Sequence, residues 1–331
     1  MKDKIVIVGH GLAGSVLAHT FLRKGIRVMV LDAKMAHSAS RVSVGLINPF
    51  IGPKFNIPDD FSLCMNQNFE FFNNIEKNCG EEYLHPIELH RVFQNSQQQE
   101  KWKLLSQTYR GRQLSSQDCQ NLGFDAPLGA GITKAWKLKV KKFLSFSENH
   151  LASISSFREE VFKPSKWKNE TIIFCDGYRS IQHEWFSQLP FNPAQGDVLK
   201  IESRLRLTLS NGSWHLPCEA EHTARIGSNW KHQDIESGPT EEAKREIRKK
   251  ISYLPNSESS KVLEHSSGVR SGTIDRQPMI GRHPHKENYY LFNGFGSRGC
   301  TTIAKNAQDI AGFLLNGRLL PSQVDLTRFL K

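Results

Sequence analysis

The stretch that decides the fold runs from Lys4 to Asp32 and reads KIVIVGHGLAGSVLAHTFLRKGIRVMVLD. A short run rich in β-branched residues leads directly into Gly9, Gly11 and Gly14, and a helix-like segment follows. A second apolar run then ends at the acid. Strand, glycine turn, helix, strand and acid, in this order and spacing, predict a βαβ unit that binds a dinucleotide.

Each glycine has a separate role in such a unit. Gly9 permits the tight turn, Gly11 lets the backbone approach a pyrophosphate, and Gly14 allows the helix to pack closely on the sheet. The helix begins near Leu12 and Ala13, where its free amide groups and the positive end of its dipole favour phosphates. The alternative is a glycine turn that only closes a loop.

Asp32 narrows the choice of dinucleotide. Its carboxylate stands at the end of the second strand, where it can accept both ribose hydroxyls of an adenosine. A 2′-phosphate would place a second anion against it, so FAD or NAD is favoured over NADP. The motif alone does not choose between FAD and NAD.

The composition is that of one large or two medium domains, with 331 residues, of which 38% are hydrophobic and 10% aromatic. No apolar run reaches about 18 residues, so we expect no membrane span. The first strand begins at Lys4, which leaves no room for a signal peptide. The six cysteines are scattered without a C-x-x-C pair, which predicts reduced thiols in a cytoplasmic protein. We expect no metal site, because His283 and His285 lack further ligands and suit exposed loops.

Hydrophobic periodicity predicts the remaining elements. Helices are expected over residues 61–83, 97–107 and 115–122, after Thr240, and near the end of the chain, where Thr301 or Thr302 would cap the helix. Strands are expected over residues 171–177, 205–209, 223–229 and 288–295.

The net charge of +11 has two interpretations, a polyanionic partner or a general aid to solubility. Residues 134–142 (KAWKLKVKK) alternate like a strand. One face would carry Trp136, Leu138 and Val140, and the other Lys137, Lys139 and Lys141. These lysines would either protect an edge strand or form a basic stripe that contacts an acidic partner.

Two arginines stand between glycines near the end of the chain, and both are candidate catalytic residues. Arg270 lies in GVRSGT and Arg298 lies in GFGSRG. Glycines let the backbone approach a ligand, and a planar guanidinium can bind a carboxylate at two points. The alternative for each arginine is a salt bridge that fastens the C-terminal segment.

Together the motifs resemble the D-amino-acid oxidase family of FAD enzymes, which includes glycine oxidase and sarcosine oxidase. The matching pieces follow in family order along nearly the whole chain: GHGLAG with Asp32, GLINP at 45–49, FCDG at 174–177, GVRSGTIDRQPMIG at 268–281 and GFGSRG at 294–299. Within this family, the last two motifs are most similar to the oxidase half of the bifunctional enzymes that modify the wobble uridine of tRNA.

This resemblance implies FAD rather than NAD, bound without a covalent link, because no cysteine lies in the segment 268–281. It implies an α/β fold in which a Rossmann-like FAD-binding domain is interleaved with a mixed-sheet α+β substrate domain. The FAD-binding domain would comprise residues 1–60, 146–194 and 266–331, and the substrate domain residues 61–145 and 195–265.

The resemblance also implies the residues that contact the cofactor. The expected FAD contacts are Gly9, Gly11, Leu12, Ala13, Gly14, Asp32, Ala33, Ser40, Arg41, Gly45, Leu46, Asp176, Gly177, Gly294, Gly296, Ser297, Arg298 and Gly299.

The activity that the resemblance implies is oxidation of an amine that bears a carboxylate. The carboxylate would dock on Arg270, with Arg298 flanking the flavin or the carboxylate, and hydride transfer to flavin would leave an imine for water to hydrolyse. The substrate would be a small amino acid or N-substituted glycine, or carboxymethylaminomethyl-uridine in tRNA. The alternatives are an NAD-dependent dehydrogenase, a glycine or D-amino-acid oxidase with no role in RNA, and a flavin-binding protein without turnover.

Overall fold

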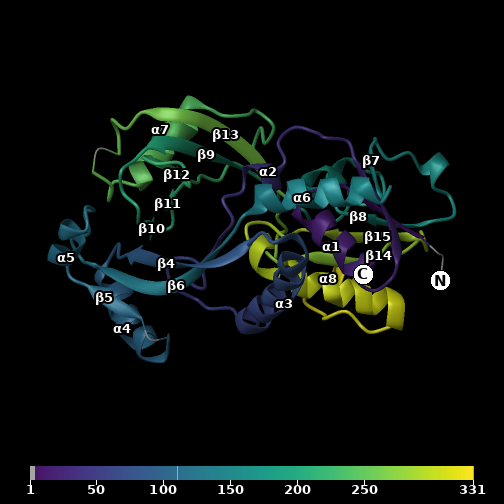
Figure 1. Ribbon diagram of the computed structural model, residues 1–331, viewed down its shortest axis with the longest axis horizontal. Helices are drawn as coiled ribbons and strands as arrows, with labels where there is room; N and C mark the ends of the chain where they lie inside the picture. The colour runs from purple at the N-terminus through teal and green to yellow at the C-terminus, as the bar shows by residue number, and fades with distance from the viewer. Residues whose placement is uncertain (1–3, 110, 256, 331) are drawn as a thin grey trace.

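A computed structural model describes residues 4–109, 111–255 and 257–330, and within them the strands form two sheets (Figure 1). The first sheet lies with both chain termini, at the right of the view. Its strand order is β14 (Met279–Arg282), β15 (Tyr289–Asn293), β8 (Thr171–Phe174), β1 (Lys4–Val8), β2 (Arg27–Asp32) and β7 (Phe157–Glu159). Its pairs are parallel except β14 with β15. This arrangement is the Rossmann-like half of the expected α/β fold.

The predicted βαβ unit is present as β1, α1 (Leu12–Leu22) and β2. Gly9 turns the chain between β1 and α1 with a φ of +103°, a backbone conformation that side chains disfavour. A Cβ atom at Gly14 would lie 1.9 Å from the carbonyl oxygen of Gly9. Only glycine therefore lets α1 pack this closely on the turn.

Helices cover one face of the first sheet, and irregular segments cover the other. Ile5 and Ile7 of β1 face a core built with α1, α3 (Phe61–Cys79), α6 (Val140–Ser153) and α8 (Gly299–Asn316). The alternating residues Val6 and Val8 face a second core, which includes Phe174 and Phe186. Both faces are buried, as parallel sheets require.

The second sheet is mixed and lies at the left of Figure 1. Its order is β13 (Val262–Arg270), β9 (Ala194–Glu202), β12 (Thr223–Gly227), β11 (Trp214–Pro217), β10 (Thr208–Ser210), β4 (Leu84–Val92), β6 (Ala130–Leu138) and β3 (Leu46–Ile47), and β5 (Arg112–Leu114) also pairs with β6. One face packs on α7 (Glu241–Lys250) and on the segment around α5 (Ser116–Asn121). The opposite face is therefore free to line a cleft.

The shorter elements complete the chain. They are α2 (Ala39–Val42), α4 (Ser96–Tyr109), η1 (Pro164–Lys166), η2 (Gly177–Gln182) and η3 (Leu326–Phe329). The strand β3 comes from the first 60 residues but pairs with β6, so this N-terminal segment contributes to both sheets.

Most of the expected helices are confirmed as α3, α4, α5, α7 and α8. Thr240 caps α7, because its side chain accepts a hydrogen bond from the amide of Ala243. The expected cap of the last helix was wrong. Arg298 is the N-cap of α8, and the hydroxyl of Thr302 donates to the carbonyl oxygen of Arg298 inside the first turn.

The predicted strand over residues 134–142 is wrong in its second half. β6 ends at Leu138, Lys139 is the N-cap of α6, and Lys141 lies in the first turn of that helix. The short alternating run after Leu138 fits the two-residue period of a strand as well as the 3.6-residue period of a helix. The buried positions from Val140 onward follow the helical period. β6 is also not an edge strand, because it lies between β4 and β3. Lys137, Lys139 and Lys141 therefore do not form one stripe.

Further sequence expectations concern single residues. His283 is buried and contacts the carbonyl oxygen of Trp185 through Nε2, so the expectation of an exposed histidine was wrong there, whereas His285 is exposed. All six cysteines are free thiols. Among the described residues, no helix is long and apolar enough to cross a membrane. The same part of the chain holds no cluster of metal-ligating side chains.

A buried pair of histidines joins the glycine turn to α6. Nε2 of His10 and Nε2 of His19 lie 3.0 and 3.1 Å from the hydroxyl oxygen of Ser147. Burial lowers the pKa of His10 to about 4 and that of His19 to about 3. Both rings are therefore neutral in the folded protein, and one hydroxyl can donate to one ring and accept from the other.

Stability should fall as the pH falls below about 6.5, because the unfolded chain then takes up protons that the folded histidines refuse. Between pH 7.5 and pH 5, each buried histidine should cost about 2 kcal/mol of unfolding free energy. Urea unfolding at both pH values measures this loss. His19→Phe should reduce the loss, whereas His285→Phe, at an exposed position, should leave it unchanged. An equal loss in the His19→Phe protein would contradict the assignment.

Candidate functional site

A cleft of about 1460 Å³ runs between the carboxyl ends of β1 and β2 and the uncovered face of the second sheet. Ligands of open α/β sheets bind at this end of the strands. Of the residues expected to contact the cofactor, the cleft is lined by Gly9, Gly11, Leu12, Ala13, Asp32, Ala33, Ser40, Arg41, Gly45, Leu46, Asp176, Gly177, Gly294, Gly296, Ser297, Arg298 and Gly299. Gly14 lies outside this lining and acts in packing α1.

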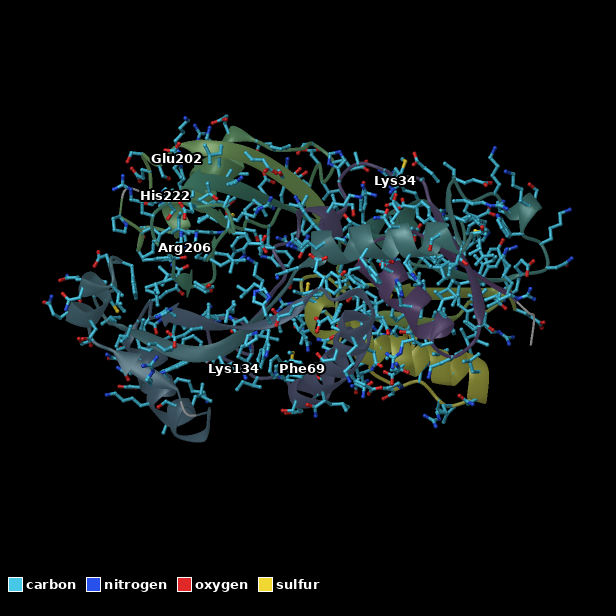
Figure 2. The ribbon with its side chains drawn as sticks, in the orientation of Figure 1. Lys34, Phe69, Lys134, Glu202, Arg206 and His222 are labelled. Atoms are coloured by element: carbon cyan, nitrogen blue, oxygen red, sulfur yellow. The ribbon has the colours of Figure 1, made fainter. Side chains whose placement is uncertain are left out.

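The first part of the cleft suits an adenosine pyrophosphate. Gly11 is the N-cap of α1 and has no side chain to cap the helix. The amide of Leu12 donates to Ser40, and the start of the helix, including Ala13, lines the cleft. Asp32 lines the same region, with Oδ1 accepting from the amide of Lys34 at 2.7 Å. Lys34, labelled in Figure 2, pairs instead with Glu148 of α6. The second oxygen of Asp32 lies 3.6 Å from Nη2 of Arg41, whose side chain is half-exposed.

Gly11 differs in detail from its expected role. A Cβ atom there would lie 3.1 Å from the hydroxyl oxygen of Ser40, which accepts a hydrogen bond from the amide of Leu12 at 2.9 Å. The missing side chain thus makes room for Ser40 as well as for a ligand. This contact brings α2 against the start of α1.

The C-terminal glycine turn closes the cleft from the other side. Asn293, at the end of β15, donates to the carbonyl oxygen of Gly177 at 2.6 Å and to the hydroxyl of Ser180 at 2.8 Å. Asp176 in turn accepts from Ser180 at 2.5 Å and lies at the same distance from Nε2 of His183. These bonds hold the turns after β8 and β15 side by side. The N-terminus of α8 follows the second turn, with its amides at the cleft.

Arg270 ends β13 and reaches across β9 into the cleft. A Cβ atom at Gly196 would lie 2.1 Å from Nη2 of Arg270, so the guanidinium occupies the space of the missing side chain. Nη2 donates to the hydroxyl of Ser228 at 2.7 Å, and Nη1 donates to the carbonyl oxygen of Asn229 at 3.3 Å. The ring of Trp230 lies 4.3 Å from Cζ. Two hydrogen bonds at its edge and the ring of Trp230 thus hold the guanidinium in place.

The charge of Arg270 is not neutralised by a direct ion pair among the described residues. Burial lowers the pKa of Arg270 to about 10, and the carboxylate of Asp197 partly offsets this effect. Asp197 is fully buried and is engaged by His265, whose Nε2 lies 2.8 Å from Oδ2. Arg270 therefore remains a cation with donors available to an anionic ligand.

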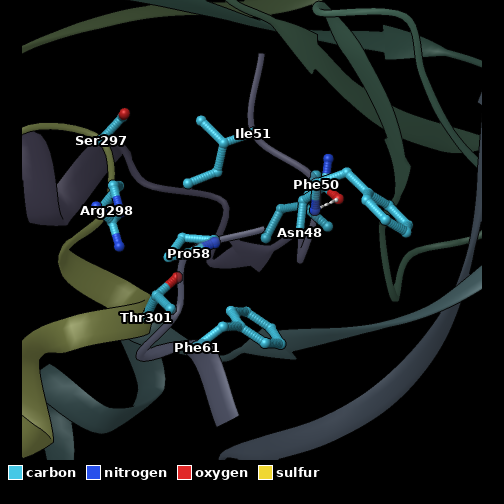
Figure 3. Close-up of a pocket in the computed structure, with 9 residues that line it drawn as sticks. Asn48, Phe50, Ile51, Pro58, Phe61, Ser297, Arg298 and Thr301 are labelled. Atoms are coloured by element: carbon cyan, nitrogen blue, oxygen red, sulfur yellow. Dashed lines mark hydrogen bonds between the residues drawn. The ribbon is translucent and has the colours of Figure 1, made fainter. Parts of the chain in front are cut away.

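Arg298 is placed differently. Its Nη2 lies 3.8 Å from Oδ1 of Asp60, which favours the structural alternative of a salt bridge for this residue. It still lines the cleft and also a smaller side pocket of about 170 Å³. Figure 3 shows Arg298 in this pocket with Ile51, Pro58 and Thr301 around it.

Several cleft residues were missed by the sequence reasoning. They are Arg91 on β4, Gly196 on β9, Trp214 on β11, and Ser228 and Trp230 after β12. Gly196 carried a signal, because a glycine inside an apolar strand often marks a close approach. Arg91 gave no signal in the sequence, because a single arginine in a strand is usually a solvated side chain.

The geometry agrees with comparisons to known proteins. Residues 4–135 and 154–311 match the DAO family, described as FAD dependent oxidoreductase. The chain belongs to this family. The family is that of the resemblance described above, and it decides for FAD over NAD as the cofactor. The protein is an FAD-dependent oxidoreductase.

Individual relatives are distant. The chain is similar to the tRNA 5-methylaminomethyl-2-thiouridine biosynthesis bifunctional protein of Leptospira borgpetersenii serovar Hardjo-bovis (strain JB197), with 22% identity over 380 residues that cover 93% of this chain and 57% of that protein. The chain thus spans little more than half the length of this relative.

Solved structures share the fold. Glycine oxidase from Bacillus cereus ATCC 14579 superposes with a TM-score of 0.77 at 17% identity, covering 96% of each chain. L-proline dehydrogenase from P. horikoshii gives a TM-score of 0.79 at 15% identity, covering 99% of this chain and 98% of that one.

Removing the carboxylate of Asp32 should weaken FAD binding by about 1–3 kcal/mol, the effect of a lost charge-assisted hydrogen bond. Asp32→Ala should therefore release FAD on dialysis under conditions in which the unaltered protein keeps it. Absorbance near 450 nm and fluorescence titration of the released protein measure the change. Asp59→Ala, which removes an exposed carboxylate outside the cleft, is the matched control. Equal FAD affinity in the two variants would contradict the assignment of Asp32.

Proposed function

We propose that the protein oxidises the C–N bond of an amine that bears a carboxylate, such as an amino acid or an N-substituted glycine. The observation that carries this proposal is Arg270, a desolvated cation at the cleft with free donors. A carboxylate can accept two parallel hydrogen bonds from a guanidinium held in this way. Ser228 and Trp230 fix the plane of the guanidinium and hence the orientation of the substrate.

The residues around Arg270 also favour the reactive form of the amine. The carboxylates that line the cleft are Asp32, Glu160 and Asp176, and all three lie on segments that we assign to FAD. A cation beside the amine lowers the pKa of its ammonium group, so the substrate loses a proton to solvent more readily on binding. We therefore propose no side-chain base for the proton on nitrogen.

FAD, when bound, supplies the acceptor for the hydride that leaves the carbon next to nitrogen. The protein positions that carbon through Arg270 at one end. At the other side of the cleft, the turn from Gly294 to Gly299 and the first amides of α8 form a group of donors that favours negative charge. Water then adds to the resulting imine and releases a carbonyl product together with ammonia, from a free amino acid, or an amine, from an N-substituted glycine.

Two substrate classes fit this arrangement, a free amino acid and carboxymethylaminomethyl-uridine in tRNA. The similarity to the bifunctional tRNA-modification protein favours the second, and the fold shared with glycine oxidase is compatible with the first. Residues 134–142 do not form a basic stripe that would support the tRNA substrate. Lys137 donates to the carbonyl oxygen of Pro217 at 3.4 Å, and Lys139 lies 4.0 Å from Glu219.

Arg270 provides the direct test of the proposed function. Arg270→Lys keeps the charge but loses the fork, and Arg270→Ala loses both. In the alanine variant, the rate of flavin reduction by substrate should fall about a hundredfold or more, equivalent to roughly 3 kcal/mol. Anaerobic stopped-flow absorbance measures the rate, and the FAD content should stay near normal.

The substrates for this test are glycine, sarcosine, D-amino acids and tRNA that carries the modified uridine. Bleaching by none of them would favour a flavin-binding protein without turnover. Bleaching by glycine at full rate in Arg270→Ala would show that another residue holds the carboxylate. Loss of FAD and of thermal stability in both variants would support the structural alternative for Arg270.

A further inference from the structure

Arg91 is a buried cation that the proposed reaction does not use. Arg91 is only 3% exposed, yet it lines the cleft. Nη1 donates to the hydroxyl of Ser210 at 2.9 Å, and Nη2 donates to the carbonyl oxygen of Gly52 at 3.2 Å. Nε has no hydrogen-bond partner, and no carboxylate pairs with Arg91 within the described part of the chain.

This environment is unfavourable for a guanidinium without a ligand. Phe55 lies 5.0 Å from Cζ, and burial lowers the pKa of Arg91 to about 10. An ion buried without a counter-charge costs several kcal/mol, more than hydrogen bonds to one hydroxyl and one carbonyl oxygen return. A neutral side chain would join Ser210 to Gly52 without that cost. The cation therefore points to an anion that arrives with a ligand.

The register of the second sheet relates Arg91 to Arg270. Val198, Gly227, Trp214, Ser210 and Arg91 are successive cross-strand partners on β9, β12, β11, β10 and β4. Partners that lie directly opposite point to the same face, so this row crosses the cleft side of the sheet. In Figure 1 the same strands descend in this order from beside α7 to β4.

The guanidinium of Arg91 lies at one end of this row, and that of Arg270 lies beside the other end. Arg270 lies over Gly196 on β9, two residues before Val198, and Arg91 contacts Ser210 on β10. Three inter-strand steps separate β9 from β10, which is roughly 14 Å along the sheet. A dicarboxylic amino acid of ordinary length spans well under half of this distance.

The floor between the two arginines carries an aromatic ring. A Cβ atom at Gly227 would lie 2.7 Å from Cζ2 of Trp214, so the indole ring lies over this glycine. Trp214 also lines the cleft, as do Lys249 and Lys250 from the end of α7. An aromatic floor with a cationic end suits a planar ring that carries a phosphate.

We propose that Arg91 forms a second oxyanion site, which receives a phosphate on the same substrate whose carboxylate lies at Arg270. This inference rests on the proposed function, because it assumes that the carboxylate occupies Arg270. The substrate class is a nucleotide whose base carries the carboxylate-bearing amine. The phosphate has two sources, a free mononucleotide or a phosphodiester of an RNA, and both offer the oxygens that a guanidinium binds at two points.

The cleft has the capacity for such a substrate. Its volume of about 1460 Å³ exceeds the roughly 300–1,000 Å³ of a pocket that holds one drug-sized ligand. FAD and a nucleotide can therefore occupy different parts of it. Gln94, which follows β4, lines the same end of the cleft as Arg91 and offers a further polar group.

The test uses the FAD-loaded protein and three reductants, namely carboxymethylaminomethyl-uridine, its 5′-monophosphate and a trinucleotide with this uridine in the centre. Anaerobic bleaching gives the half-saturating concentration of each. At least one phosphate-bearing compound should saturate at a concentration on the order of tenfold lower than the nucleoside. An advantage for the trinucleotide alone assigns the site to a phosphodiester, and one for the monophosphate assigns it to a terminal phosphate.

Arg91→Gln should remove this advantage and leave reduction by the nucleoside unchanged, and Arg91→Lys should keep part of it. Arg112→Gln, which removes an exposed arginine of the same sheet that pairs with Glu88 outside the cleft, should keep all of it. Inorganic phosphate should compete with the phosphate-bearing substrate but not with the nucleoside in the unaltered protein, a result that needs no variant to fold.

Equal half-saturation by all three compounds, or an advantage that survives in Arg91→Gln, would overturn the second site while the oxidase function stands. Reduction by glycine or sarcosine but not by the uridine compounds would likewise overturn it. If no amine bleaches the flavin, the proposed function fails first, and the two failures are thereby distinguished.

Discussion

The close packing of α1 on the glycine turn is the contact on which the cofactor site depends. Because Gly14 has no side chain, the helix meets the carbonyl oxygen of Gly9 directly, and its N-terminus is directed to the cleft. The parallel pairing of β1 with β2 then carries Asp32 to the same edge of the sheet. The parallel pairing of β15 with β8 carries the second glycine turn there from the other end of the chain. The proposed FAD site thus depends on this close contact and on the parallel pairing that brings both glycine turns to one edge of the sheet.

A second missing side chain shapes the opposite wall. Gly196 leaves a space on β9 that the guanidinium of Arg270 fills, so the side chain lies flat on the sheet and against Trp230. The charge is retained because a fully buried carboxylate, Asp197, lies nearby without pairing directly with it. A direct ion pair would have neutralised the site. The arrangement keeps the cation rigid and leaves its remaining donors to a ligand, which limits the entropy lost on binding.

The sequence predicted the first sheet well and the second sheet poorly. The βαβ unit is local, and each of its residues has a defined steric or charge role, so Gly9 to Asp32 could be read directly. The second sheet joins strands that lie far apart in the chain, and its register alone relates Arg91 on β4 to β9, over which Arg270 lies. Residues 134–142 failed for a related reason, because a short alternating run fits a strand and the start of a helix equally. The sequence singled out Arg298 but could not predict its approach to Asp60, because that contact joins distant segments.

The net charge of +11 was the least informative feature, and energetics explain why. Surface cations such as Lys142, which lies 3.4 Å from Glu219, and Lys244, which lies 3.1 Å from Glu241, form pairs worth at most about 1 kcal/mol each. A buried guanidinium is different, because its desolvation costs several kcal/mol and a bound anion recovers part of that. The two arginines within the cleft are therefore more informative about the substrate than the excess of positive charge on the surface. Their separation across the sheet, rather than the number of lysines, is the property that distinguishes a nucleotide from a free amino acid.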